Sequence, residues 1–400
     1  MLASAALLLI GLTLQATAID RPILMAHYMP WYATKTVSGH WGWHWTMNKF
    51  DPEKRLPDGR REAASHDYPL IDLYDSSDPH TLECQVQLMK LAGIDGVIVD
   101  WYGIKDFHDY EAIHRNTQAL ISVLKRAGLK FAICYEDQSI KHMVTGKALT
   151  PDAAVGHGHE VFQWMAKNWF RDEAYLSLDG KPLLLVFGPQ YFEAAQWKEI
   201  LTGIEPQPRM HVLPHLTSRI EGAGKFGWPP VAGGKTISRK EWLKYFDQLY
   251  FGKEVAKTVV SVAFPGFHDI YNDAGLHDSY GFIDETGGRT LTESLDRALT
   301  SGAPVVQIAT WNDYGEGTVI EPTRRRQFQH LEEIQKRRRP QSANKASAGP
   351  SDLKLPVRLF ELRKAASGDE RASKLLDEAS AKLLSSDIQA VRSHLQQLAQ

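Results

Sequence analysis

The feature that most constrains the fold of this chain is an alternation of short, β-rich apolar runs with longer amphipathic segments from residue 23 onward. Such an alternation is typical of βα units built around a parallel sheet. The eight predicted strands are 23–28, 95–101, 130–135, 182–187, 210–215, a weaker one at 225–228, 258–264 and 305–311. The predicted helices are 79–91, 110–127, 151–170, 191–201, 239–251 and 291–300.

Eight alternating units predict an α/β fold, a (β/α)8 TIM barrel with long βα loops. An open doubly wound sheet is the alternative, but no Gly-x-Gly-x-x-Gly follows the first strand, as a dinucleotide fold of that class would require. The segment 33–77, between the first strand and the first long helix, is too long for an ordinary connection and contains Trp41, Trp43 and Trp45. Long βα loops of this kind are where barrels build their functional sites.

The N-terminus reads as a signal peptide over residues 1–18. Residues 2–14 form an apolar run, and Ala16-Thr17-Ala18 supplies the small-x-small pattern that a signal peptidase recognises. The run is shorter than the ~20 residues of a membrane span, so we expect a secreted or periplasmic protein with no membrane span in the mature chain. An uncleaved anchor is the alternative, because no Lys or Arg precedes the run.

The remaining chain divides by composition into three parts. Residues 19–338 form the predicted catalytic barrel. Residues 339–353 are rich in small and polar side chains and read as a linker, and 354–400 form a helical appendage that contains no Trp and no Tyr. We expect this tail to serve packing or partner binding rather than chemistry; protein partners are left open.

Charge and composition narrow the classes of ligand. The 46 Lys and Arg residues against 48 Asp and Glu residues leave no basic surplus for binding nucleic acid. The 11 Trp, 14 Tyr and 16 His residues either fill a core or form platforms for ring-shaped ligands such as sugars. Cys84 and Cys134 have no partner at metal-binding spacing and read as buried thiols.

Carboxylates and aromatic residues recur together where the predicted strands end. In a barrel the carboxyl ends of the strands converge on one face. Cleavage of a glycosidic bond requires two carboxyl groups beside the sugar, and aromatic rings stack on sugar rings. The strand-end residues that we expect to contact a substrate are Tyr28, Trp31, Tyr32, Asp100, Trp101, Tyr102, Glu136, His215, Trp311, Asn312 and Glu321.

The segment after the eighth strand is the strongest candidate for chemistry. Asp313 and Glu316 are three residues apart, and their α-carbons are at most ~10 Å apart. Gly315 and Gly317 allow the backbone to pass close to a ligand. Two nearby carboxyl groups repel each other's ionisation, which leaves one as acid and the other as base. The alternative is a solvated acidic turn without catalytic role.

The run Thr310-Trp311-Asn312-Asp313-Tyr314-Gly315-Glu316 resembles the catalytic segment of glycoside hydrolase family 71, the α-1,3-glucanases. Its continuation through Glu321-Pro322 resembles the matching segment of family 99, the endo-α-mannosidases. The segments Tyr28-Met29-Pro30-Trp31-Tyr32 and 96–102 also resemble the family 99-like pattern. The resemblance covers roughly residues 22 to 330 and implies a (β/α)8 hydrolase of α-linked polysaccharides that needs no metal.

The resemblance also implies roles for single residues. Glu316 matches the general acid of both families, and Asp313 matches the second catalytic carboxylate, although family 99 has Glu there and His at the position of Gly315. Glu136 resembles the acid that contacts substrate in family 99-like sites. Family 71 inverts by activating water, whereas family 99 is thought to retain through the sugar's own 2-hydroxyl. The shorter Asp and the closer match to the family 71 run favour inversion.

Several histidines offer other readings. His27, His215 and His268 are either donors to sugar hydroxyls or ordinary strand-end histidines. The pairs with spacings that would allow a shared metal are His40 with His44 and His157 with His159. A metal-dependent barrel of the amidohydrolase type typically carries His-x-His at the end of its first strand, where this chain has His27-Tyr28-Met29. We therefore expect no metal and no cofactor.

The sequence thus predicts an exported glycoside hydrolase that acts on an α-linked glycan of the mannan or glucan type, with Glu316 as acid and Asp313 as base. Two other hypotheses are retained. One is a non-hydrolytic relative that binds glycans or takes part in polysaccharide assembly, against which a signal peptide argues. The other is a metal-dependent TIM-barrel hydrolase.

Overall fold

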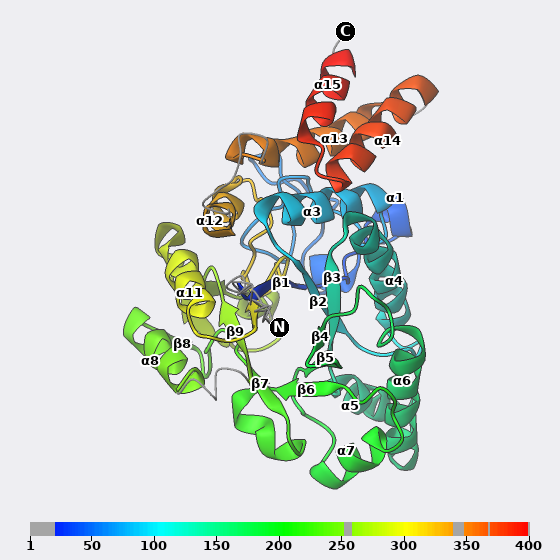
Figure 1. Ribbon diagram of the computed structural model, residues 1–400, viewed down its shortest axis with the longest axis vertical. Helices are drawn as coiled ribbons and strands as arrows, with labels where there is room; N and C mark the ends of the chain where they lie inside the picture. Colours follow the sequence, from blue (N-terminus) through cyan, green and yellow to red (C-terminus); the bar gives the residue numbers. More distant parts are fainter. Residues whose placement is uncertain (1–20, 252–257, 339–347, 367–368, 399–400) are drawn as a thin grey trace, which may run out of the picture.

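The computed structural model describes residues 21–251, 258–338, 348–366 and 369–398. Eight parallel strands form a closed barrel (Figure 1). In chain order they are β1 (Ile23–Tyr28), β2 (Gly96–Trp101), β3 (Lys130–Tyr135), β5 (Lys181–Val186), β6 (Arg209–Val212), β7 (Gly224–Phe226), β9 (Val259–Ala263) and β12 (Val305–Ile308). β1 lies between β12 and β2, and pairing of β3 with β5 closes the ring. The predicted TIM barrel is confirmed.

Helices surround the barrel, with α3, α4 and α6 on one side and α8 and α11 on the other (Figure 1). The helices are α3 (Pro79–Ala92), α4 (Tyr110–Ala127), α5 (Gln138–Thr145), α6 (Ala154–Asn168), α7 (Ala194–Leu201), α8 (Arg239–Leu249), α11 (Arg289–Leu299) and α12 (Gln329–Arg338). α3 begins as its sequence predicts, because the Asp78 side chain accepts the backbone N–H of His80. The predicted helix 151–170 instead starts with a 3₁₀ turn at Pro151–Ala153 and continues as α6.

The barrel interior is apolar toward the amino ends of the strands and polar toward their carboxyl ends. Alternate strand residues point inward. Those at the amino end, including Met25, Ile98, Ala132 and Leu183, form one buried cluster. Two residues further along the strands, His27 and Asp100 occupy interior positions and line the cavity at the carboxyl end. The site therefore has a closed apolar layer beneath it.

Two long loops build up the carboxyl end of the barrel. The loop after β1 contains α1 (Lys35–Ser38) and α2 (Trp43–Thr46), and it is anchored by Trp45, which is buried against Tyr32 with 4.0 Å between ring centroids. The loop after β9 contains β10 (Phe267–His268), α10 (Tyr271–Ala274), β11 (Gly281–Ile283) and a 3₁₀ turn at Thr286–Gly288. β10 and β11 join β8 (Lys235–Thr236) in a small separate sheet.

Two smaller elements complete the barrel domain. β4 (Ser177–Leu178) forms an antiparallel hairpin with β5 at the amino end of that strand. A 3₁₀ segment, Pro214–Arg219, follows β6. The predicted strand 210–215 therefore ends earlier than expected, and His215 lies in the 3₁₀ segment.

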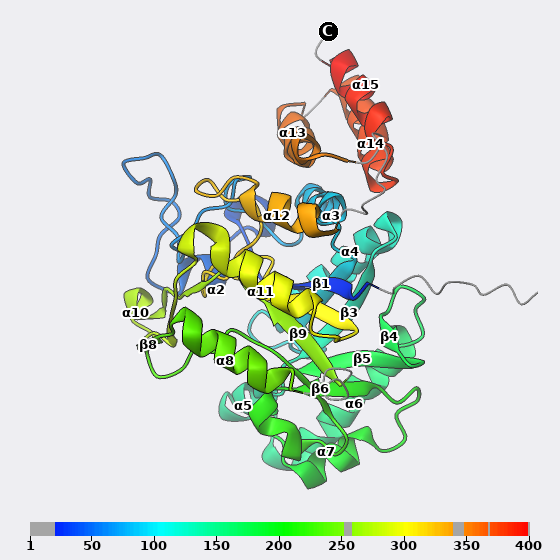
Figure 2. The ribbon, with the colours of Figure 1, turned by 60° about the vertical axis from the view of Figure 1, so that its left-hand side comes forward.

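The C-terminal tail packs on the outside of the barrel against α3 (Figure 2). It consists of a 3₁₀ turn at Pro350–Leu353 and of α13 (Lys354–Ala365), α14 (Glu370–Leu384) and α15 (Ile388–Leu398). The Gln87 side chain donates to the Ser380 hydroxyl at 2.7 Å, and Lys90 donates to the Leu384 carbonyl at 2.6 Å. No described residue of the tail lines the cavity at the carboxyl end.

The predicted signal peptide at 1–18 and the residues 339–347 of the predicted linker lie outside the described residues. Among the helices of the described part of the chain, none combines the length and the apolar composition that crossing a membrane requires.

Candidate active site

A cavity of about 1160 Å³ opens at the carboxyl end of the barrel. Loops that follow β1, β2, β3, β5, β6, β7, β9 and β12 all contribute to its wall. The predicted site residues that line it are Trp31, Tyr32, Asp100, Tyr102, Glu136, His215, Asp313 and Glu316. Both predicted catalytic carboxyl groups and most of the expected contact residues therefore line the same cavity, because all of them follow or end strands of the barrel.

Hydrogen bonds to neighbouring loops fix the segment after β12. The Asn312 side chain donates to the Met29 carbonyl at 2.9 Å and accepts the Met29 N–H at 2.8 Å. The Asp313 N–H donates to the Thr310 hydroxyl at 2.8 Å. Gly317 has a φ of 66°, and a side chain there would meet the His268 carbonyl oxygen, so only glycine fits. The carboxyl groups of this segment are therefore presented by a rigid turn.

Asp313 and Glu316 differ in environment although they are close in sequence. Burial raises the pKa of Asp313 to about 6, while the backbone N–H groups of Glu316 and Gly315 oppose the rise. Burial and the charge of Asp313 raise the pKa of Glu316 well above its usual value. One Glu316 oxygen, Oε2, has no hydrogen-bond partner. At neutral pH this arrangement favours an ionised Asp313 and a protonated Glu316.

Two further carboxyl groups face the same cavity. Burial, with the charge of Asp313, raises the pKa of Asp100 to about 8. Burial and then the charge of Asp100 raise the pKa of Glu136 well above its usual value. Since several of these groups cannot be ionised together in a buried space, the cavity holds mostly neutral acids, which can donate hydrogen bonds to hydroxyl groups.

The structure adds wall residues that the sequence analysis did not name. Trp228 lines the cavity and lies edge-on to His27, with 4.8 Å between ring centroids, and its indole opposes the rise in the pKa of Glu316. Tyr271 and Tyr280, from the loop after β9, also line the cavity. Trp228 is the last residue of the weak predicted strand 225–228, so the strand-end rule could have found it. No comparable signal marks the two tyrosines, because they lie far from any strand of the barrel in sequence.

Five residues that we expected to contact substrate lie behind the cavity wall, which corrects their predicted position; they are Tyr28, Trp101, Trp311, Asn312 and Glu321. Trp101 is fully buried and packs on Trp169 with 4.9 Å between ring centroids. Trp311 is also fully buried. A residue at a strand end points either inward or outward, and sequence position alone does not decide which.

Glu321 supports the catalytic segment from behind. Its carboxylate accepts hydrogen bonds from the Tyr74 hydroxyl at 2.9 Å, from the Tyr314 hydroxyl at 3.0 Å and from the Gln85 side chain at 2.8 Å. Gln85 in turn accepts from the Tyr28 hydroxyl at 2.6 Å. Burial raises the pKa of Glu321 to about 7. The hydrogen bond to Glu321 fixes the side chain of Tyr314, which lies between Asp313 and Glu316 in the sequence.

Aromatic rings line the side of the cavity near the first loop. Trp31 stacks on His44 with 4.0 Å between ring centroids and an angle of 6°. Trp43, which is 39% exposed, stands at the cavity wall, whereas Trp41 does not line the cavity and donates instead to Glu53 at 2.6 Å. Of the three tryptophans in this loop, Trp43 is therefore the one that lines the cavity.

The histidines of the two pairs weighed as metal ligands make other contacts. His44 stacks on Trp31, and His40 is exposed with its Nδ1 on the Ser38 carbonyl. His159 Nδ1 bonds to the Ile200 carbonyl at 2.8 Å, and His157 lies beside Glu160. His268 stacks on His66 and does not line the cavity.

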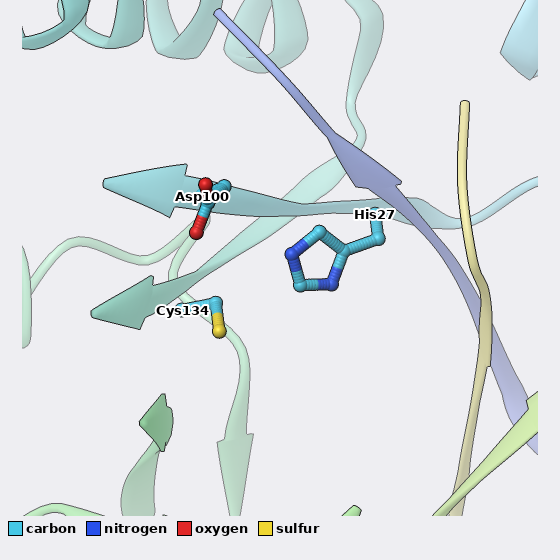
Figure 3. A group of neighbouring side chains, drawn as sticks. All are labelled: His27, Asp100 and Cys134. Carbon is cyan, nitrogen blue, oxygen red and sulfur yellow. The ribbon is translucent and has the colours of Figure 1, made fainter. Parts of the chain in front are cut away.

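A group of three possible metal ligands arises instead from residues that the sequence did not connect. His27, Asp100 and Cys134 are buried on β1, β2 and β3, and one donor atom of each lies within 4.8 Å of the others (Figure 3). Cys134 and Cys84 are both free thiols, as expected. Burial lowers the pKa of His27 to about 4, so its imidazole is neutral.

Comparison with known proteins gives two likenesses. Residues 25–205 match the family described as Glycosyltransferase WbsX. Among solved structures, the fold is similar to that of the family 99 endo-α-mannosidase from Bacteroides thetaiotaomicron, with a TM-score of 0.57, 17% identity and coverage of 86% of this chain and 99% of that chain. No curated protein sequence matches the chain.

Two other structures agree. The same enzyme in complex with bis-tris propane gives a TM-score of 0.55 at 18% identity, covering 75% of this chain and 87% of that chain. A glycoside hydrolase-like protein gives 0.56 at 13% identity, covering 80% and 94%. The resemblance to family 71 stays a prediction. The likeness to family 99 is one of fold, and the chain is a (β/α)8-barrel protein whose fold is similar to that of the endo-α-mannosidases of glycoside hydrolase family 99.

Proposed function

We propose that this protein is an exported glycosidase that cleaves an α-linked glycan of the mannan or glucan type. The observation that carries the proposal is the pair Asp313 and Glu316, which faces a cavity at the carboxyl end of the barrel with pKa values that favour opposite protonation states. Pairs of carboxyl groups in such contrasting states are how glycosidases divide acid and base roles.

In the proposed reaction, Glu316 donates its proton to the glycosidic oxygen as the bond to the anomeric carbon breaks. Asp313 accepts a proton from the attacking nucleophile, which is either water or the sugar's own 2-hydroxyl. The neutral acids Asp100 and Glu136 are placed to hydrogen-bond to sugar hydroxyls, and Trp31 and Trp43 offer aromatic faces at the wall. No metal ion takes part in these steps.

The α-linked substrate class is supported by the fold shared with endo-α-mannosidases. It is tested by incubating the purified mature protein with α-1,6- and α-1,2-linked mannans and with α-1,3- and α-1,4-glucans, and by separating the products. The expected result is release of oligosaccharides or monosaccharides from one of these α-linked polymers, and no release by Glu316→Gln. Cleavage of β-linked glucans or mannans alone would contradict the proposed substrate class.

A second candidate function is transfer of a glycosyl group to an acceptor other than water. The match of residues 25–205 to a family described as a glycosyltransferase favours it. The two candidates are separated by repeating the incubation with a labelled acceptor sugar. Labelled products longer than the acceptor, in excess of free reducing sugar, would favour transfer over hydrolysis.

Export is supported by the sequence of residues 1–18. The test is expression of the full chain in a bacterial host, followed by fractionation and N-terminal sequencing. We expect the protein outside the cytoplasm with Ile19 as its first residue, whereas an intact N-terminus in the membrane fraction would indicate an anchor.

A further inference from the structure

The interior of the barrel carries one polar layer directly beneath the cavity. Asp100 on β2 is the register partner of Cys134 on β3, and His27 on β1 is the partner of Ile98, one inward-facing step below Asp100. Figure 3 shows the imidazole, the carboxyl group and the thiol around one small space between these strands. The three side chains are buried, and their donor atoms lie within 4.8 Å of one another.

The hydrogen bonds of Gln307 fix which nitrogen of His27 faces this space. The Gln307 amide nitrogen donates to the Gly227 carbonyl at 2.6 Å, which turns its oxygen toward His27 Nδ1 at 3.1 Å. Because that oxygen can only accept, the proton of the ring sits on Nδ1. The lone pair is therefore on Nε2, which has no hydrogen-bond partner. Histidines that bind metals show this same arrangement, with the remote N–H held by a carbonyl oxygen.

Asp100 shows a similar unfilled bonding capacity. Its Oδ1 is buried and has no hydrogen-bond partner, so Asp100 and His27 do not satisfy each other. A buried polar group left without a partner destabilises the fold, because it has lost its hydrogen bonds to water. Two such atoms beside one thiol point to a ligand that uses all three donors.

We propose that His27, Asp100 and Cys134 bind one divalent transition-metal ion of the zinc class on the floor of the cavity. One nitrogen, one sulfur and one carboxylate oxygen suit a borderline-soft ion and disfavour magnesium and calcium, which prefer oxygen ligands alone. Three protein ligands leave one position of a tetrahedron open. His27 and Asp100 line the cavity, so the ion has an entry route and its open position faces the substrate space.

Binding requires a small contraction of the group. With bond lengths of about 2.0–2.3 Å, tetrahedral ligand atoms lie ~3.3–3.8 Å apart, and the donor atoms here lie within 4.8 Å. Rotation of side chains about their χ angles closes a gap of this size without movement of the strands. Glu316 and Asp313 are not among the ligands, but Asp100 also faces the substrate space, so the site is tested by metal binding rather than by activity.

The test uses Co²⁺ as a spectroscopic probe for zinc. The mature protein is stripped with a chelator, dialysed, checked for folding by circular dichroism and titrated with Co²⁺ and then with Zn²⁺. We expect one Co²⁺ per chain, an intense near-ultraviolet band from thiolate-to-Co²⁺ charge transfer, and loss of both on addition of Zn²⁺. Failure of the folded wild-type protein to bind either ion at micromolar concentration would overturn the proposal.

The two cysteines provide a matched control. Cys134→Ser is expected to abolish the charge-transfer band and weaken Co²⁺ binding by at least about 10-fold, whereas Cys84→Ser, which changes the other buried thiol on α3, leaves both unchanged. A band that survives in Cys134→Ser would refute the site. If Cys134→Ser fails to fold, Asp100→Asn replaces it, with loss of Co²⁺ affinity as the expected result and unchanged affinity as the refuting one. None of these measurements depends on enzymatic activity, so they stand apart from the proposed function.

Discussion

Asp313 Oδ1 accepts the backbone N–H of Glu316 at 2.9 Å, so the candidate base is held by the main chain of the candidate acid. This bond favours the ionised form of Asp313 and opposes the effect of its burial. The Glu316 side chain receives no comparable help from the backbone, and burial together with the charge of Asp313 raises its pKa well above its usual value. The short turn thereby places the two carboxyl groups three residues apart and favours an ionised Asp313 beside a protonated Glu316.

Replacement of Glu316 by Gln keeps the shape of the side chain and removes its proton. We expect hydrolysis of substrates with poor leaving groups to fall by at least about 10²-fold while glycan binding survives. Activated aryl glycosides should lose less, because their leaving groups depart with little protonation. The measurement is kcat/KM on both substrate types.

Glu332→Gln serves as the control for this variant, since Glu332 is exposed on α12 and outside the cavity. It should hydrolyse both substrate types as the wild type does. An equal loss of rate on both substrate types in Glu316→Gln would contradict its role as the acid.

The pH dependence of kcat/KM should be bell-shaped. Asp313 acts as a base only when ionised, so activity should rise with pH through about 6, the raised pKa of this carboxyl group. Glu316 acts as an acid only when protonated, so activity should fall again as pH passes its own raised pKa. Initial rates measured between pH 4 and pH 9 test this. A rate that increases steadily as pH falls below 5 would show that Asp313 need not be ionised.

Trp101 and Trp43 should respond in opposite ways to replacement by Ala. Trp101 is fully buried, so Trp101→Ala should lower the free energy of unfolding by about 3–5 kcal/mol and leave the affinity per folded molecule unchanged. Trp43 is 39% exposed at the cavity wall, so Trp43→Ala should weaken glycan binding with little loss of stability. Denaturant unfolding and isothermal titration with the glycan measure the two effects. Weakened glycan binding by a stable, folded Trp101→Ala protein would show that Trp101 contributes to the substrate-binding surface.

Treatment with a chelator should leave hydrolysis unchanged, because the proposed chemistry uses carboxyl groups alone. The assay compares activity before and after metal removal, with metal content measured in parallel. Loss of hydrolysis that returns on addition of Zn²⁺ would favour a metal-dependent hydrolase over the carboxylate mechanism.

We expect hydrolysis with inversion. An inverting base must stand off the anomeric carbon to admit a water molecule, with ~6.5–9.5 Å between the carboxyl groups. Asp313 is shorter than a glutamate and is held back by the main chain of its own turn. Proton NMR of the first product from an α-linked substrate should show the β-anomer. Initial release of the α-anomer would indicate retention, by attack of the substrate's 2-hydroxyl.

Local patterns in the sequence suffice for most of the fold. The strands β1 and β3 and the helix α4 lie where apolar spacing predicts them, because burial of one face or both faces imposes the periods of a helix or a strand directly on the chain. The short strand β7 was predicted weakly, since Gly224 and Lys225 give little apolar signal there. The direction in which side chains point at the strand ends could not be predicted from these patterns, as the burial of Trp101 shows.

By itself, the sequence determined the barrel and the turn that contains Asp313 and Glu316, because the periodicity of the elements and the spacing within one loop are local properties of the chain. Only the tertiary structure decided that Glu321 lies behind the cavity, that Trp228 contacts Glu316, and which residues meet on the cavity floor. His27, Asp100 and Cys134 are far apart in sequence and become neighbours through the register of parallel strands. That register depends on the packing of the whole barrel and leaves no pattern in any single segment.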